Sequence, residues 1–327
     1  MIYEYAVDPA LVASWAKNFD IGLAPQFGLD QRRLVSDFPM HWEGDVTGAL
    51  LESFGYDCGD PDYIAAQAHL NGLLHYMKSS MPARGQRSTG GDWIEQALLA
   101  HTSEPFHAIL TGEENSDRDE VISSNIVKRL QDPRWYLPTV GVTAKTAGGL
   151  ADALEPLLRT ANKIILVDPY FNPKEAAYQE VLTRLVERAI QGRAPGRALP
   201  TLTIMSGVDE RAPAAAGIPV ETQLRNAANH RGQLALTHLG GCIPVAMSLT
   251  FQCIAQFAGG DQVHNRYLLT DVGGACFPYG VQAMGSQVFD DLTLLYAGQY
   301  RHRWRQYAQG EGLTVVGTPV VVQGSQA

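Results

Sequence analysis

The segment HNRYLLTD, from His264 to Asp271, carries the residue types of a phosphoryl-transfer site. Its spacing is HxRx4D, and Arg266 follows the histidine by two residues. On an extended strand, residues two apart point to the same face at a spacing of about 7 Å. An imidazole can attack phosphorus, and a guanidinium can bind two phosphate oxygens and neutralise their charge. The pattern predicts a nucleophile and an anion binder in one pocket, while Asp271, on the opposite parity, is expected to bind backbone or neighbouring donors.

Two further polar groups follow in the chain. Gly285, Ser286 and Gln287 form the sequence GSQ, and the pair Asp290 and Asp291 precedes the apolar run LTLLY. A hydroxyl beside a glycine can approach a phosphate oxygen closely. A carboxylate that faces the imidazole selects its tautomer and stabilises the imidazolium. We expect Ser286 and Gln287 to contact the substrate and Asp291 to orient the histidine.

Together these motifs resemble the signature of the phospholipase D superfamily, HxKx4D followed by GSxN and then an acidic residue at the start of a strand. The resemblance covers roughly residues 139 to 310. It includes IILVDPYF, which looks like the strand that opens each repeat of that family. The resemblance implies catalytic roles for His264 as the nucleophile, Arg266 as the signature lysine, Asp271 as the signature aspartate, Ser286 as the serine and Asp291 as the acid that orients the histidine.

The chain departs from that signature at two positions and in the spacing from Asp271 to Gly285, which is longer than usual. Arg266 replaces the lysine, and Val288 occupies the position of the asparagine, beside the amide of Gln287. Arginine keeps the charge but changes the geometry of phosphate binding. Three functions follow as alternatives. They are a metal-independent phosphodiesterase without a cofactor, a degenerate module that binds nucleic acid or a partner protein, and a phospholipase or phosphatidyl transferase.

The chain holds one such motif, because no other histidine has Lys or Arg two residues on and Asp seven on. The superfamily needs one histidine that attacks and one that protonates the leaving group. The resemblance therefore implies a homodimer that shares its site across a twofold axis. By analogy with the dimeric nucleases of the superfamily, the expected substrate is nucleic acid, most of all DNA. Stand-alone members often accompany an ATPase or helicase in bacterial genome defence, and we expect the N-terminal part to bind such a partner.

A second group of cations lies near the C-terminus. Arg301, Arg303 and Arg305 interleave with aromatic residues in YRHRWRQY. A rim of cations and aromatic rings can hold a nucleic-acid strand, so these arginines are candidate substrate contacts. The alternative is an amphipathic helix with Trp304 in the core.

Alternating strands and helices must position these groups. The run IILVDPYF predicts a buried strand, residues 174–191 an amphipathic helix, and TLTIMSG a second strand, which together make a βαβ unit. Further strands are expected at MSLTFQC, VHNRYLLTD, LTLLY and GLTVVGTPVVV, with a helix at RHRWRQYAQ. The predicted fold class is α/β, with a phospholipase D-like mixed sheet flanked by helices.

Residues 1–138 are predicted to form a separate, mainly α-helical domain of unknown role. A helix is expected after Asp8, whose carboxylate can cap the first turn, and further helices are expected after Asp60 and after Asp92. The run FHAILT suggests one strand. X-Pro steps at positions 133 and 138 push the chain out of helical geometry. The phosphodiesterase domain is therefore expected over residues 139–327.

Bulk composition narrows the classes of protein. A composition of 45% hydrophobic and 18% charged residues is typical of a folded globular protein. The length of 327 residues predicts two domains. A net charge of −9 argues against broad wrapping of nucleic acid but allows a local basic patch. The N-terminus lacks a basic flank before an apolar leader, and apolar stretches are interrupted, so we expect a cytoplasmic protein without a membrane span. The cysteines and the acidic segments lack metal-ligand spacing, so neither disulfide nor metal is expected.

Overall fold

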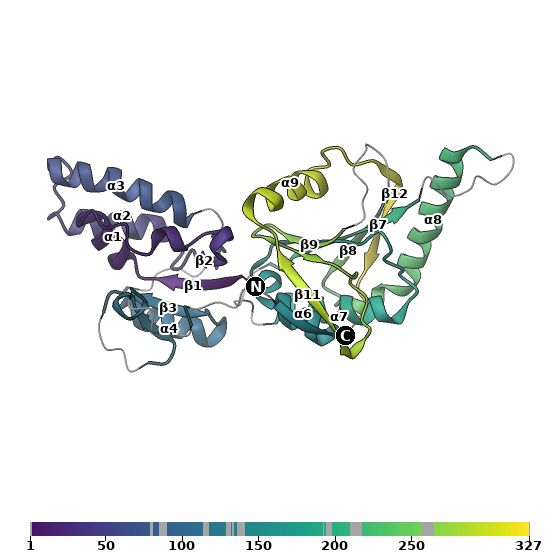
Figure 1. The fold of residues 1–327 in the computed structure, drawn as a ribbon, viewed down its shortest axis with the longest axis horizontal. Helices are drawn as coiled ribbons and strands as arrows, with labels where there is room; N and C mark the ends of the chain where they lie inside the picture. The colour runs from purple at the N-terminus through teal and green to yellow at the C-terminus, as the bar shows by residue number, and fades with distance from the viewer. Residues whose placement is uncertain are drawn as a thin grey trace. The chain divides into compact units, whose positions relative to one another are not determined.

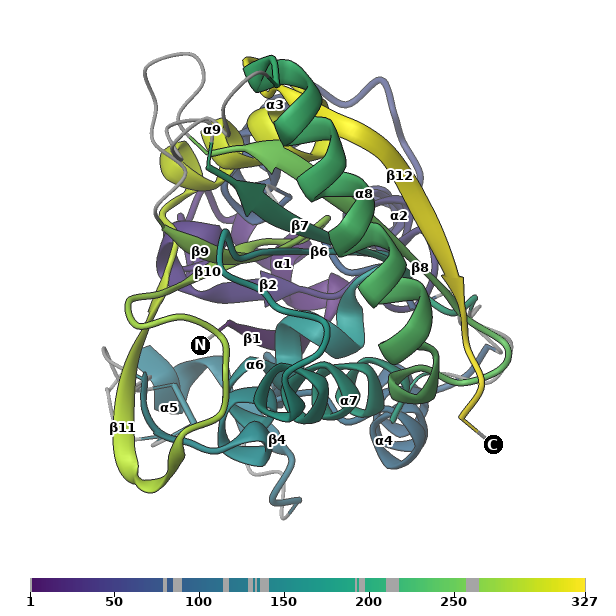
Figure 2. The same cartoon turned by 90° about the vertical axis from the view of Figure 1, so that its right-hand side faces the viewer.

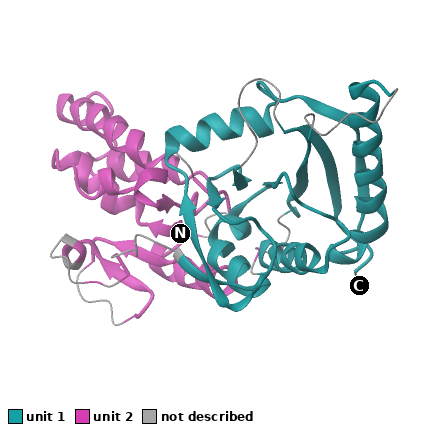
Figure 3. Ribbon diagram, turned by 45° about the vertical axis from the view of Figure 1, so that its right-hand side comes forward, with its two compact units in different colours: residues 1, 140–191, 198–327 teal, residues 2–139, 192–197 magenta. Residues whose placement is uncertain are grey.

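A computed structural model describes the chain over residues 2–78, 81–84, 90–113, 118–128, 132, 134–135, 141–191, 193, 198–209, 218–256 and 265–326. The chain forms two compact units (Figure 3). The N-terminal unit comprises residues 2–139 with 192–197, and the C-terminal unit comprises residues 140–191 and 198–327. The division lies next to the proline steps at which the sequence indicates a boundary.

The N-terminal unit is built around a four-stranded parallel sheet with helices on both faces (Figure 1). Its elements are β1 (Tyr3–Val7), α1 (Pro9–Lys17), η1 (Ala24–Gln26), η2 (Leu29–Gln31), β2 (Arg33–Val35), α2 (Trp42–Glu52), α3 (Pro61–Met77), α4 (Trp93–Ser103), β3 (Ala108–Thr111), β4 (Val121–Ser123) and α5 (Ser124–Lys128). The strand order is β2-β1-β3-β4. Tyr5 and Val7 of β1 belong to the core with α1, α2 and α3, whereas Ala6 belongs to the core with α4. An all-parallel sheet needs such cover on both faces.

The helix starts in this unit follow the sequence closely. Asp8, Asp60 and Asp92 each accept a hydrogen bond from the backbone N–H two residues on, at 2.9, 2.8 and 3.0 Å. The expected helices are thereby confirmed as α1, α3 and α4, and the expected strand is confirmed as β3. The sheet around β3 is an addition to the mainly helical domain that the sequence predicts.

Strand β1 is not predicted from the sequence because it contains a charged residue, Glu4. Glu4 is buried, and it accepts hydrogen bonds of 2.7 Å from Arg84 and from Ser36. In sequence an isolated glutamate reads as a solvent-facing residue, since carboxylates are rarely buried without a partner. Its partner Arg84 is 80 residues away, so the local pattern gives no sign of the pair.

The C-terminal unit contains an eight-stranded mixed sheet. Its elements are β5 (Gly141–Lys145), α6 (Ala147–Thr160), β6 (Lys163–Val167), α7 (Ala176–Ile190), β7 (Thr201–Val208), α8 (Val220–His238), η3 (Gly240–Cys242), β8 (Ser248–Ala255), β9 (Arg266–Thr270), β10 (Gly274–Phe277), β11 (Gly285–Leu294), α9 (Ala297–Ala308) and β12 (Val315–Gln323). The strand order is β12-β8-β7-β6-β9-β10-β11-β5, in which β6, β7 and β8 are parallel and the other pairings are antiparallel.

Helices cover both faces of this sheet (Figures 1 and 2). Helices α6 and α7 lie side by side below it, α9 lies above it, and α8 packs along β12 and β8. The fold is therefore α/β, with a mixed sheet flanked by helices. The predicted βαβ unit is confirmed as β6, α7 and β7. No helix in the described part of the chain is long and apolar enough to span a membrane.

Candidate active site

Charged and polar side chains gather at the carboxyl edge of the parallel strands. Asp168 directly follows β6, and Ser206 lies near the end of β7. Strand β9 is antiparallel to β6 with Tyr267 opposite Val167, so the first residue of β9, Arg266, lies beside Asp168. In open α/β sheets this edge is where ligands bind.

The register of the strands puts Asp168 and Arg266 on the same face of the sheet. Leu166 pairs with Leu268, and side chains two residues apart share a face. Both leucines line an apolar core together with Leu182 of α7. Asp168 and Arg266 therefore lie on the face that α7 covers.

The same face continues to the other edge of the sheet. Ala275 of β10 pairs with Leu268 on one side and with Leu294 of β11 on the other. Asp290 has the parity of Leu294, and the pairing of β11 with β5 adds Lys145 to this face. Groups from four strands thus project to one side of the sheet.

Asp168 is fully buried and is held by its neighbours. Its carboxylate accepts hydrogen bonds from the backbone N–H groups of Tyr170 and Val281, at 2.9 and 3.1 Å. The Nε atom of Arg266 lies 4.0 Å away. Burial raises the pKa of Asp168 above its ordinary value, against the hydrogen bonds and the charges of Arg266 and Lys145, which lower it. A buried carboxyl group with a shifted pKa beside a cation is typical of active sites.

Lys145 and Asp290 form a second charged pair on this face, and both side chains are fully buried. The Lys145 ammonium donates a hydrogen bond of 2.7 Å to the carbonyl of Tyr279 and lies 3.5 Å from an Asp290 oxygen. Neither carboxylate oxygen of Asp290 has a hydrogen-bond partner among the described residues. Buried polar atoms are nearly always bonded, so this carboxylate has room for a donor from a substrate or from a catalytic group.

Two guanidinium groups converge on the segment that follows β6. Arg266 lies over the ring of Tyr170, 4.8 Å from its centroid, and Arg231 of α8 donates to the carbonyl of Phe171 at 3.3 Å and to Ser206. Three cations against two carboxylates leave a net positive charge, which suits an anionic ligand. We call Lys145, Asp168, Arg231, Arg266 and Asp290 the charged cluster.

Arg266 and Asp271 of the HxRx4D motif lie at opposite ends of β9. His264 lies outside the described residues, whereas Arg266 is part of the charged cluster. Asp271 follows the far end of β9, and its carboxylate accepts hydrogen bonds from the backbone N–H groups of Asn162 and Lys163, at 2.8 and 3.1 Å. It binds backbone donors, as its parity predicts, and it joins β9 to the start of β6.

The GSQ motif lies on β11 beside Lys145. Gly285 pairs with Lys145 and has a φ of 148°, a conformation that glycine adopts more readily than other residues. Ser286 and Gln287 are exposed. The structure thus brings the motif to the edge of the charged cluster without burying its side chains.

The acidic residue of the cluster differs from the one that the sequence indicates. Asp291 is exposed, and it lies on the face opposite to the cluster. Its neighbour Asp290 is the carboxylate that contacts Lys145. A shift of one residue along a strand reverses the face, so the two roles cannot be told apart without the register.

The three C-terminal arginines lie on α9. Arg301 and Arg305 are exposed, and Arg303 is half-buried over the ring of Tyr267, 5.4 Å from its centroid. Trp304 is half-buried, so α9 is an amphipathic helix that packs on the sheet. The arginines lie outside the charged cluster, and their contact with substrate stays a prediction.

Several residues of the charged cluster are not identified as site residues by the sequence analysis. Asp168 has a usable signal, because an acid directly after a buried parallel strand lies at the edge that binds ligands. Asp290 belongs to the acidic pair of the motif, but the spacing does not distinguish it from Asp291. Lys145 and Arg231 have no signal, since they come from different elements and only the fold brings them together. Among the residues that the structure describes, no group of three His, Cys, Asp or Glu side chains is arranged to hold a metal ion.

Asp168 predicts a measurable pH dependence of stability. Its folded-state pKa is raised above the ordinary value of 3.8, so the folded state binds this proton more readily than the unfolded state. The contribution of Asp168 to the free energy of unfolding is therefore stabilising at low pH and is lost as pH rises through its folded-state pKa. We expect the unfolding free energy of the wild type, relative to Asp168→Asn, to fall as pH rises above about 4. Urea unfolding of both proteins at pH values below and above about 4 tests this prediction. A difference in unfolding free energy that stays constant or rises with pH would contradict it.

Comparison with protein-family models and with curated proteins finds no match for this chain. Its function therefore has to be argued from the chemistry of the site.

Proposed function

We propose that the C-terminal unit is a metal-independent phosphodiesterase that cleaves nucleic acid, most of all DNA. The observation that carries the proposal is the convergence of Arg266 and Arg231 on one segment at the carboxyl edge of the sheet, with the buried Lys145 on the same face. Phosphoryl transfer depends mainly on positioning and on neutralising the charge of the transferring group. A net positive cluster that includes the arginine of the HxRx4D motif can supply both.

The proposed reaction has two steps. His264 attacks phosphorus to form a phosphohistidine, and the bond from phosphorus to the leaving oxygen breaks while His264 of the partner subunit protonates that oxygen. Water then attacks the phosphohistidine, the partner's His264 accepts the proton of that water, and the phosphate monoester is released. Arg266 and Ser286 bind the phosphoryl oxygens. Asp290, with its unbonded buried oxygens, is the stronger candidate to accept the imidazole N–H, in place of Asp291.

A second candidate function is a module that binds phosphate without turnover. Arg266 is already engaged within the protein, since its guanidinium lies over Tyr170, near Asp168, and donates to the carbonyl of Pro278 at 3.5 Å. An arginine fixed in this way can hold a phosphate oxygen and still fail to follow the transferring group.

Incubation in EDTA with DNA, RNA and phosphatidylcholine separates these functions. We expect cleavage of DNA, no cleavage of the lipid, and a loss of about 10² to 10³ in kcat for Arg266→Ala, the cost of removing one charge-stabilising donor. The exposed Arg184→Ala on α7, which lies outside the cluster, is the matched control and is expected to keep wild-type activity. DNA binding without cleavage would favour the binding module, and cleavage of the lipid alone would contradict the nuclease.

A further inference from the structure

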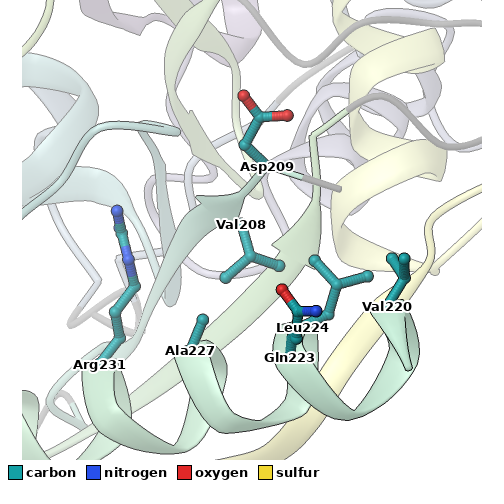
Figure 4. A pocket seen from close by; sticks show the side chains of 7 residues that line it. All are labelled: Val208, Asp209, Val220, Gln223, Leu224, Ala227 and Arg231. Carbon is teal, nitrogen blue, oxygen red and sulfur yellow. The ribbon is translucent and has the colours of Figure 1, made fainter. Parts of the chain in front are cut away.

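A small pocket opens beside the charged cluster, between the end of β7 and α8 (Figure 4). Its volume is about 230 Å³. Apolar side chains form most of its wall, a carboxylate lies at one side, and a guanidinium lies at one end. These residues include Val208, Val220, Leu224, Ala227, Asp209 and Arg231.

The spacing of the α8 residues explains the wall. Val220, Leu224, Ala227 and Arg231 follow one another at intervals of four, three and four residues, which places them on one face of a helix. Figure 4 shows these side chains in a row that faces β7. Val208 faces them from β7, since it shares the parity of Ser206. The pocket is therefore part of the same face of the sheet as the charged cluster.

Arg231 belongs to both sites. It lines the pocket, while its guanidinium donates to Ser206 and to the carbonyl of Phe171, next to the ring that Arg266 covers. A ligand whose phosphate is held by the two arginines would have its adjoining group at the mouth of this pocket.

We infer that the pocket binds one unpaired nucleobase of the substrate, next to the scissile phosphate; the inference rests on the proposed function. Apolar walls suit the faces of a base, and every base has such a face. The volume is below the roughly 300 to 1,000 Å³ of pockets for drug-sized ligands, so it suits one ring system and excludes a base pair.

This occupant determines the substrate class. A base can enter such a pocket only when it is unstacked and unpaired. The substrate is therefore single-stranded, or a duplex opened locally at the site of cleavage.

The test fills the pocket by a substitution at a wall residue that is not a member of the charged cluster. Ala227 is exposed, so Ala227→Trp can place an indole in the pocket, whereas the exposed neighbour Asn226→Trp places the same ring outside it. We expect wild type and Asn226→Trp to bind deoxyadenosine 5′-monophosphate about 10- to 100-fold more tightly than deoxyribose 5-phosphate, which lacks the base. Ala227→Trp is expected to bind both equally. Val220→Ser, at a second exposed wall position, is expected to reduce the preference several-fold.

Calorimetric titration in EDTA measures these affinities. Equal affinity of the wild type for the two ligands, or a full base preference in Ala227→Trp, would overturn the inference. Hydrolysis of bis(p-nitrophenyl) phosphate, which has no base, tests catalysis separately: its absence would overturn the proposed function and leave the base preference measurable. We expect Asn226→Trp, outside the pocket, to hydrolyse this reporter at the wild-type rate.

Discussion

Replacement of His264 by alanine is expected to abolish phosphodiester cleavage, with a loss of about four orders of magnitude or more in kcat. In the proposed mechanism the substitution removes the nitrogen that attacks phosphorus, and in a shared dimeric site it also removes the group that protonates the leaving oxygen. The measurement is the rate of hydrolysis of bis(p-nitrophenyl) phosphate and of a single-stranded DNA oligonucleotide in EDTA. The exposed His302→Ala on α9 is the matched control and is expected to keep activity.

Mixing experiments test whether the site is shared between subunits. If one site needs His264 from both subunits, a dimer of wild type and His264→Ala is inactive. After exchange of subunits, total activity should then follow the square of the wild-type fraction. Activity in direct proportion to that fraction would show that each subunit holds a complete site. Undiminished activity of His264→Ala would contradict the phosphohistidine mechanism altogether.

Local signals account for the part of the fold that the sequence predicts. The βαβ unit of β6, α7 and β7 follows from one apolar run, one amphipathic helix and a second apolar run, which are consecutive in the chain. The starts of α1, α3 and α4 follow from single capping aspartates. Each of these signals lies within a few residues of the element that it specifies.

The parts that escape prediction depend on distant partners or on register. Glu4 can be buried within β1 because Arg84, which is 80 residues away in the chain, pairs with its carboxylate. The residues of the charged cluster likewise come from separate elements, namely β5, the end of β6, β9, β11 and α8. In the candidate site, Arg266 is identified by its motif, whereas the choice between Asp290 and Asp291 turns on a strand pairing that no spacing in the chain reveals.

The pair of adjacent aspartates provides the prediction with the largest expected effect on stability. Asp290→Ala leaves the buried Lys145 ammonium without its carboxylate, and breaking a buried pair in this way costs about 3 to 5 kcal/mol. Asp291→Ala removes an exposed carboxylate on the other face, so its effect should stay within about 0.5 kcal/mol. Urea unfolding measures both values. Equal effects of the two substitutions would contradict the register of β11 with β5.

A double substitution separates the structural role of this pair from its catalytic role. Replacing Lys145 by Met together with Asp290 by Leu removes both charges, and apolar substitutes for a buried ion pair are often neutral or stabilising. We expect the double variant to unfold at a higher urea concentration than Asp290→Ala, while cleavage stays impaired because the imidazole has lost its acceptor and the phosphate a nearby cation. Recovery of full activity with stability would show that the pair only supports the fold. Loss of activity in Asp291→Ala alone would instead return the orienting role to the residue that the motif indicates.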